Sequence, residues 1–290
     1  MKLGFIGLGN LGTPIAENIL TSGHEVFVYN RTASKTKPLT DKGATACATV
    51  KELTAACTVI ITMVSDDKAL KSICEGEDGL IKNMQPGSVH ISMSTILPLT
   101  AEELSNQHTQ NGSHYLAAPV FGRPEAARAR KLNFVMSGGG AHRPQFEQLL
   151  KDAGGAGVWD FGDVVTAANT IKLCGNFMIA SALEAIGESV ALAEKSNIDK
   201  QKMWSFFTQT IFNSPIYINY GNIIVNRLFE PAGFSMQLGL KDVNLVLSQA
   251  AHVQHKMPLA NLLQNHMQQL IEKKGPEVDW STVSQAAEIN

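Results

Sequence analysis

The sequence predicts two domains of different class: an α/β domain with a doubly wound parallel sheet at the N-terminus, and a domain made only of helices after it. The length of 290 residues leaves room for about two domains of ordinary size. Short apolar runs alternate with helical patterns over the first half, and from about residue 163 only helical patterns continue. We therefore expect an α/β domain at residues 1–162 and an all-helical domain at residues 163–290.

The strands of the first half are short apolar runs, and helical stretches separate them. Residues 2–7 form the first run, which a glycine ends, and residues 14–20 then carry apolar side chains at helical spacing. A helix stop at Gly23 precedes a second run, 26–29, of β-branched and aromatic residues. Further strands are expected at 59–64, 88–91, 114–117 and 134–136, and helices at 66–74 and 99–107. Repeated β-α-β units predict a parallel sheet with helices on both faces.

The second half begins with one unusually long helix. Residues 164–195 contain no proline and only two glycines, and this helix would link the two domains. Helical patterns continue at 201–208, 216–227, 237–255 and 259–272, and Pro215, Pro231 and Pro258 mark the joins.

Composition excludes several classes of partner and location. Lys and Arg total 24 against 26 Asp and Glu, and a net charge of -2 gives no field that would hold nucleic acid or an anionic membrane. No N-terminal signal peptide and no uninterrupted apolar segment of membrane-spanning length is evident. We expect a cytoplasmic protein with a small-molecule ligand.

The cysteines predict no metal site. They form no Cys-x-x-Cys pair and have no nearby His spacing suited to zinc, so reduced thiols are expected. They are Cys47, Cys57, Cys74 and Cys174.

Charge is scarce in the helical half. Charged residues make up 17% of the chain, below the roughly 25% of ordinary soluble proteins. Between residues 164 and 193 the charged residues are Lys172, Glu184 and Glu188. Helices this poor in charge are expected to be buried all round. Because one such domain has too little interior to enclose them, we expect a homodimer or a higher homo-oligomer.

A glycine-rich turn follows the first strand and opens the first helix. Gly7 permits a sharp turn, Gly9 lets the backbone approach a pyrophosphate, and Gly12 allows close packing of helix on strand. The helix N-terminus then offers N–H groups to the anion. The alternative is a glycine turn without a ligand, but the strand before it and the helix after it favour a dinucleotide site in a Rossmann domain. The turn comprises Gly7, Leu8, Gly9, Asn10, Leu11 and Gly12.

The end of the second strand selects the cofactor. NAD-binding domains usually place a carboxylate there for the ribose 2'-hydroxyl, whereas this chain has Asn30, Arg31 and Thr32. Arg31 would stack on adenine or pair with a 2'-phosphate, and Thr32 would donate a hydroxyl. NADP(H) is therefore favoured over NAD(H). The alternative for Arg31 is a solvated loop cation.

These features, with four further motifs in order, resemble the β-hydroxyacid dehydrogenase family, which includes 3-hydroxyisobutyrate dehydrogenase and 6-phosphogluconate dehydrogenase. The resemblance extends along nearly the whole chain. The further motifs are Ser94-Thr95-Ile96-Leu97-Pro98, Ala118-Pro119-Val120-Phe121-Gly122, Asn169-Thr170-Ile171-Lys172-Leu173-Cys174-Gly175-Asn176 and Lys241-Asp242.

The resemblance implies a role for each matching residue. Lys172 would be the general acid or base at the substrate oxygen, and Asn176, one helical turn further on, would bind the substrate. Residues four apart share a helix face, so both can address one molecule. From the residues alone, Lys172 is equally well explained as a lysine that snorkels to the helix surface.

Contacts at the cofactor follow in the same way. The resemblance assigns Thr95 to the nicotinamide ribose and Lys241 to the cofactor. Met63 and Val64 end a strand at the carboxyl edge of the sheet, where such sheets bind ligands, although core packing explains them equally well.

The substrate loop departs from the family pattern. Members typically read Asp-Ala-Pro-Val-Ser-Gly-Gly, whereas this chain has Ala117-Ala118-Pro119-Val120-Phe121-Gly122-Arg123. Phe121 removes a hydroxyl and adds bulk, Gly122 keeps one amide accessible, and Arg123 supplies a charge or faces solvent. With Ser94, these three residues are the expected substrate contacts, and a different or larger substrate is an open alternative.

The sequence thus predicts an NADP(H)-dependent oxidoreductase that transfers hydride to or from a small carboxylated 3-hydroxy acid or aldehyde acid. Two alternatives stay open. An imine reductase has the same two-domain plan but usually lacks the lysine at 172, and so does a non-catalytic NADPH-binding scaffold.

Overall fold

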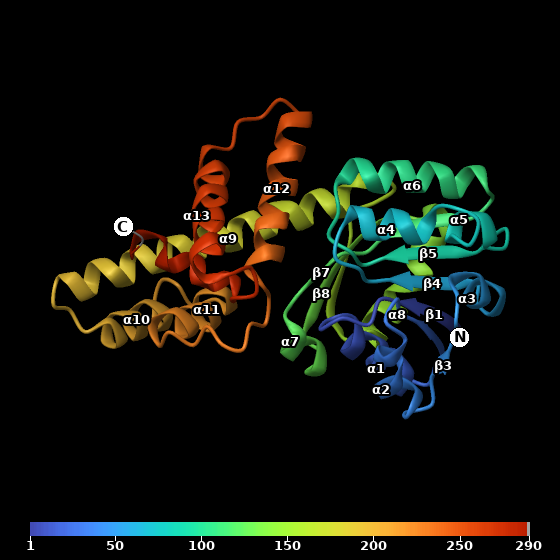
Figure 1. The fold of residues 1–290 in the computed structure, drawn as a ribbon, viewed down its shortest axis with the longest axis horizontal. Coiled ribbons are helices and arrows are strands. Elements are labelled where there is room, and N and C mark those ends of the chain that lie inside the picture. Colours follow the sequence, from blue (N-terminus) through green and yellow to red (C-terminus); the bar gives the residue numbers. More distant parts are fainter. Residues whose placement is uncertain (289–290) are drawn as a thin grey trace. The chain divides into compact units, whose positions relative to one another are not determined.

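The computed structural model describes residues 1–288 (Figure 1). The chain divides into two compact units, Met1–Lys172 and Leu173–Asn290, and the division falls inside the helix α9, Thr166–Lys195.

The first unit is built on a nine-stranded sheet in the order β3-β2-β1-β4-β5-β6-β8-β7, with β9 beside β8. Strands β1 to β6 run parallel, which confirms the doubly wound Rossmann arrangement. The strands are β1 Lys2–Ile6, β2 Glu25–Tyr29, β3 Thr45–Ala46, β4 Val59–Thr62, β5 Val89–Ser92, β6 His114–Ala117, β7 Val120–Phe121, β8 Leu132–Gly138 and β9 Gly155–Asp160.

The expectation of a wholly parallel sheet is wrong at one edge. Strand β8 runs antiparallel to both β6 and β7. The connection between β7 and β8 is too short for the dozen or so residues that a parallel crossover needs, so the chain turns back on itself. The sequence patterns also miss β3, β7 and β9. Two of these have only two residues, and β9 begins with glycines.

Strand alternation builds one apolar core on each face of the sheet. Leu3 and Phe5 join one cluster, whereas Ile6 joins the other. The first cluster includes side chains of α1 and α8, and the second includes side chains of α3, α4 and α6, which places helices on both faces (Figure 1). The helices of this unit are α1 Gly12–Thr21, α2 Lys37–Thr40, α3 Val50–Ala56, α4 Asp67–Cys74, α5 Leu80–Asn83, α6 Pro98–Gln110, α7 Pro124–Arg128 and α8 Glu147–Asp152, with 3-10 turns at Ala33–Thr36 and Gly140–Phe146.

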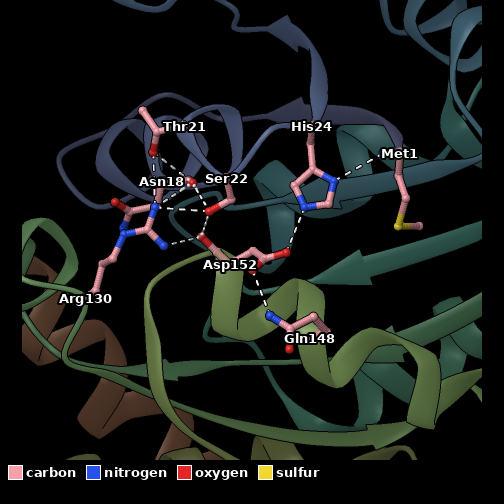
Figure 2. A network of polar contacts seen from close by, with 8 residues as sticks. All are labelled: Met1, Asn18, Thr21, Ser22, His24, Arg130, Gln148 and Asp152. Carbon is pink, nitrogen blue, oxygen red and sulfur yellow. Dashed lines mark hydrogen bonds and ion pairs between the residues drawn. The ribbon is translucent and has the colours of Figure 1, made fainter.

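A polar network fixes the far end of α1 (Figure 2). The Arg130 guanidinium donates to the Asn18 carbonyl at 2.9 Å and to the Asp152 carbonyl at 3.2 Å. His24 lies 2.8 Å from the Asp152 carboxylate, which also accepts from Gln148 at 2.9 Å. These bonds tie α1, which begins at the glycine turn, to α8 and to the loop before β8. The glycine turn therefore opens a helix whose far end is anchored to the rest of the unit.

The second unit is all-helical, as predicted. Its core combines apolar side chains from α9, α11, α12, α13 and the segment after them, where the Trp280 indole donates to the Tyr220 hydroxyl at 3.0 Å. Gly187 lets α9 approach that segment, because an added Cβ would lie 2.1 Å from the Ser284 carbonyl oxygen. The elements after α9 are α10 Lys200–Gln209, α11 Pro215–Val225, α12 Met236–His252, α13 Pro258–Lys274 and a 3-10 segment, Trp280–Glu288, that the sequence patterns do not predict.

Helix α9 bears on two expectations. In the single chain Met178 is 68% and Leu192 70% exposed, so burial all round would need the further subunit that was expected with it. By length and composition alone the helix is also long and apolar enough to cross a membrane, although no segment of that length was expected. Half of its apolar window is buried in the protein, and the core helix of a soluble protein passes the same test, so this is weak evidence for a membrane.

Candidate functional site

The glycine turn has the geometry that close approach of backbone to backbone requires. Gly7 has a φ of 101°, and a Cβ added there would lie 2.2 Å from the Met63 carbonyl oxygen. A Cβ on Gly12 would lie 2.1 Å from the Gly7 carbonyl oxygen, whereas Gly9 has nothing within 4 Å of that position. Gly7 and Gly12 are thus enclosed and Gly9 faces open space. The turn fits a pyrophosphate site, because backbone can be approached at Gly9.

The predicted selector residues follow β2 directly. Asn30 lies beneath the turn, where its side-chain oxygen accepts from the Leu8 N–H at 2.9 Å. Arg31 and Thr32 are exposed, as are Asn10 in the turn and the loop that follows Thr32. Leu11, which is half-buried, is the N-cap residue of α1. Asn30 therefore positions the glycine turn, while Arg31 and Thr32 stay accessible to a ligand.

A hydrogen bond joins two of the residues predicted at the ends of β4 and β5. Val64 N–H donates to the Ser94 hydroxyl at 2.9 Å, and Ser94 is fully buried. Met63 N–H donates to the Ile6 carbonyl at 2.9 Å, so the strand end is anchored to β1. Met63, Val64 and Thr95 are half-buried. Ser94 thus fixes the backbone of Val64 at the end of β4.

Lys172 contacts the substrate loop at Phe121. Its Nζ lies 4.1 Å from the centroid of the Phe121 ring, within the range of a cation–π interaction. Lys172 is only 8% exposed, so the interpretation of a lysine that snorkels into solvent is wrong. The sequence motifs place Phe121 and Lys172 in one family pattern, and the structure brings them into contact.

The next two loop residues are held by local packing. Gly122 has a φ of 142°, and an added Cβ would lie 2.4 Å from Leu132 Cδ2, so only glycine fits there without strain. Arg123 is half-buried at the N-cap of α7, with its Nε 3.8 Å from the Glu125 carboxylate. Its charge is thus set beside the loop that carries Phe121.

In the second unit, Asp242 links the two remaining predicted residues. Asn176 Nδ2 donates to Asp242 Oδ2 at 2.5 Å, and Lys241 Nζ lies 2.7 Å from Asp242 Oδ1. Asp242 is 2% exposed. The sequence reasoning noted the Lys241-Asp242 pair as a motif but gave Asp242 no role. Because Lys172 and Asn176 lie one turn apart on α9, both also address the same side of that helix.

A buried histidine chain was not predicted. His90 Nδ1 lies 3.0 Å from His108 Nε2, and the Thr62 hydroxyl lies 2.9 Å from His90 Nε2. His108 Nδ1 lies 2.8 Å from the Ser113 hydroxyl, which itself donates to the His108 carbonyl. Burial lowers the pKa of both histidines, which keeps them neutral near pH 7. Ser113 has one hydroxyl proton, so His108 Nδ1 donates to it, and with both rings neutral His90 Nδ1 then donates to His108 and Thr62 donates to His90.

Cys74 completes a group of three potential metal ligands with these histidines, and the ligand atoms lie within 4.8 Å of one another. The spacing along the sequence does not indicate this group, because α4, β5 and α6 bring its members together from separate segments. The Cys74 sulfur is 3.9 Å from His90 Nδ1. The histidine nitrogens that would face an ion already share a hydrogen bond, so we interpret the group as a hydrogen-bonded chain.

Comparison with known proteins decides the family. Residues 2–167 match the model of the NAD binding domain of 6-phosphogluconate dehydrogenase, and residues 166–287 match that of the NAD-binding domain of NADP-dependent 3-hydroxyisobutyrate dehydrogenase. The chain belongs to the β-hydroxyacid dehydrogenase family. It is accordingly a nicotinamide-dependent dehydrogenase or reductase that acts on CH–OH groups, and it takes a small-molecule substrate.

Relatives of this family member cover its whole length. It is 41% identical to an uncharacterized oxidoreductase, YfjR, of Bacillus subtilis over 98% of both chains. It is 30% identical to 2-hydroxy-3-oxopropionate reductase of Escherichia coli over 100% of this chain and 98% of the relative. The solved structure of Psf3 in complex with NADP+ and 2-OPP has a TM-score of 0.88 at 24% identity, covering 98% of this chain and 99% of that one, and shows the shared fold.

Proposed function

We propose that this protein is an NADP(H)-dependent reductase or dehydrogenase of a small carboxylated 3-hydroxy acid or aldehyde acid, with Lys172 as the general acid or base. The observation that carries the proposal is the buried Lys172 ammonium, held on the substrate loop and one turn from Asn176 on the same helix. An ammonium taken out of water at a substrate loop is suited to donating a proton to a developing alkoxide.

The nicotinamide supplies the hydride, and the residues of the chain supply position and the proton. In reduction, Lys172 donates a proton to the carbonyl oxygen and becomes a neutral amine, which takes a proton back from water after release. Asn176 donates to the substrate, and its amide is oriented by Asp242. In oxidation the same lysine, as the amine, accepts the hydroxyl proton.

The preference for NADP(H) rests on the accessible loop after β2. Arg31 and Thr32 are exposed there, and neither carries the negative charge that would repel a 2'-phosphate. Arg31 can pair with that phosphate in two parallel hydrogen bonds. The NADP+ bound in the Psf3 structure is consistent with this preference.

We also propose that the protein is a cytoplasmic homodimer or a higher homo-oligomer. Exposed apolar side chains on the helical unit support assembly, because a monomer would leave them in water. They include Met178, Leu192, Phe206, Ile211, Ile218 and Leu228. The low net charge, which gives no field that would hold an anionic membrane, agrees with this location.

A substrate panel tests the reaction class. Purified protein would be mixed with NADPH or NADH and with glyoxylate, succinic semialdehyde or 2-hydroxy-3-oxopropionate, and with NADP+ and 3-hydroxyisobutyrate or 6-phosphogluconate. We expect turnover of at least one carboxylated aldehyde or 3-hydroxy acid, with NADP(H) preferred. Absence of turnover across the panel, together with no NADPH binding, would refute the proposal. The relative named 2-hydroxy-3-oxopropionate reductase makes that compound the first to assay.

A further inference from the structure

Phe121 contacts Lys172, and the proposed proton transfer gives its ring no role. Phe121 stands where family members typically have serine, and its ring carries no hydrogen-bond donor or acceptor. The ring nevertheless lies 4.1 Å from Lys172 Nζ, closer than many cation–π contacts. The substitution therefore replaces a hydrogen-bonding neighbour of the site by one that binds charge.

The ring is held in this place by its strand. Phe121 ends β7 and pairs with Asn133 of β8, and it packs against the apolar cluster beneath α4 and α6. Gly122, with its positive φ and its close approach to Leu132, fixes the direction in which the chain leaves the ring. Ile171, next to Lys172, packs against the same cluster. Strand pairing and packing thus fix the positions of Phe121 and Lys172, the two residues in contact.

We propose that Phe121 is the positioning residue for Lys172: its ring stabilises and orients the buried ammonium through a cation–π interaction, and so favours the proton-donating form of the lysine. A ring face attracts the charge without requiring one fixed direction of an N–H bond, as an acceptor oxygen does. The ammonium is then held beside the loop at which the substrate is proposed to bind. This inference rests on the proposed function of Lys172.

The charge of the lysine can be followed without cofactor or turnover. In the protein free of cofactor, lysines carrying 13C would be titrated by NMR, with the Lys172 signal assigned by its loss in Lys172→Ala. We expect Phe121→Leu to lower the pKa of Lys172 by about one unit relative to wild type, because the ring no longer stabilises the ammonium. Phe121→Tyr, which keeps the ring face, is expected to restore the wild-type titration.

Fluorinated phenylalanines at position 121 separate charge from shape. Each added fluorine weakens the attraction of the ring for a cation while the ring keeps nearly its size. We expect the Lys172 titration to shift stepwise downward from phenylalanine to trifluorophenylalanine. The matched control is Phe161→Leu, since Phe161 is an exposed phenylalanine of the same unit, and it is expected to leave the titration unchanged.

Turnover gives the second readout. With whichever aldehyde acid the enzyme reduces, Phe121→Leu is expected to lower kcat about tenfold with less than a twofold change in NADPH affinity, and to move the alkaline limb of the pH profile down with the pKa of Lys172. A Lys172 titration that is the same in wild type, Phe121→Leu and the fluorinated series would overturn the positioning role. A wild type without turnover would refute the proposed function alone, because the titration still tests the contact.

Discussion

The glycine turn and the substrate loop reach their geometry by different means. At the turn, the constraint lies in the backbone, since a Cβ at Gly7 or Gly12 would meet a carbonyl oxygen within about 2 Å. At the loop, it lies in a pair of side chains from distant segments, Phe121 and Lys172. A backbone constraint leaves a local sequence pattern, whereas a side-chain pair leaves none. The cofactor end of the site is therefore the more predictable from sequence, and the substrate end is where this family member can differ.

The largest effect on stability is expected from adding a side chain at an enclosed glycine of the turn. Gly12→Ala places a Cβ 2.1 Å from the Gly7 carbonyl oxygen, so α1 must shift and the free energy of unfolding should fall by about 3 kcal/mol. Gly9→Ala is the matched control, because that position is open, and its effect should stay within about 0.5 kcal/mol. Chemical denaturation of both variants measures this. Equal losses would contradict the separate roles of the two glycines.

Acid is expected to act on the first unit through its histidine chain. Burial, and secondarily His114, lowers the pKa of His108 to about 4, and burial with His108 beside it lowers the pKa of His90 well below its usual range. Above pH 6.5 both histidines are neutral, folded or unfolded, and contribute no pH dependence. As the pH falls from 6.5 to 4, the histidines bind protons in the unfolded chain but stay neutral in the folded chain. The free energy of unfolding therefore declines.

The share of that decline due to His108 follows from its pKa. A pKa held near 4 against an ordinary 6.5 corresponds to about 3 kcal/mol lost by pH 4. His108→Gln keeps a side chain that can donate and accept but does not titrate, and it should remove about this share of the pH dependence while the share of His90 remains. Thermal unfolding at successive pH values measures both. An unchanged slope in the variant would show that other groups cause the acid sensitivity.

A smaller effect is expected at the exposed selector. Arg31→Ala should weaken NADPH binding about tenfold, because it removes roughly one charge-assisted hydrogen bond to the 2'-phosphate. It should change NADH binding less than twofold, since NADH lacks that phosphate. Lys51→Ala removes an exposed cation elsewhere in the same unit and serves as the control. Fluorescence titration with each cofactor gives the affinities. If the affinities for NADPH and NADH fell by the same factor, Arg31 would be assigned to the adenine or the pyrophosphate, which both cofactors share.

Much of the fold could be predicted because its signals are local. The strand of residues 2–7, the glycine turn and the long helix each show in a short window, and the structure has β1, α1 and α9 there. The antiparallel return of β8 could not be predicted, since direction depends on which strand it meets. The two-residue strands β3 and β7 are too short to show a period.

The site divides in the same way. The sequence singles out Lys172 and Phe121, but only the fold puts the ammonium on the ring. The sequence gives Asp242 no distinct signal, since a carboxylate beside a lysine is typical of an exposed pair, whereas in the fold it is buried and bonded to Asn176. His90 and His108 belong to β5 and α6, and nothing in their spacing indicates contact. Contacts between distant segments are what sequence patterns leave open.

The central claim is that Lys172 moves the proton while the glycine turn holds the cofactor independently. The most direct test measures NADPH binding and the single-turnover rate of reduction, for wild type and Lys172→Ala, with Lys195→Ala as an exposed control on the same helix. We predict that Lys172→Ala lowers the rate roughly 100-fold and leaves NADPH affinity within twofold, whereas the control changes neither. An undiminished rate in Lys172→Ala would contradict the account.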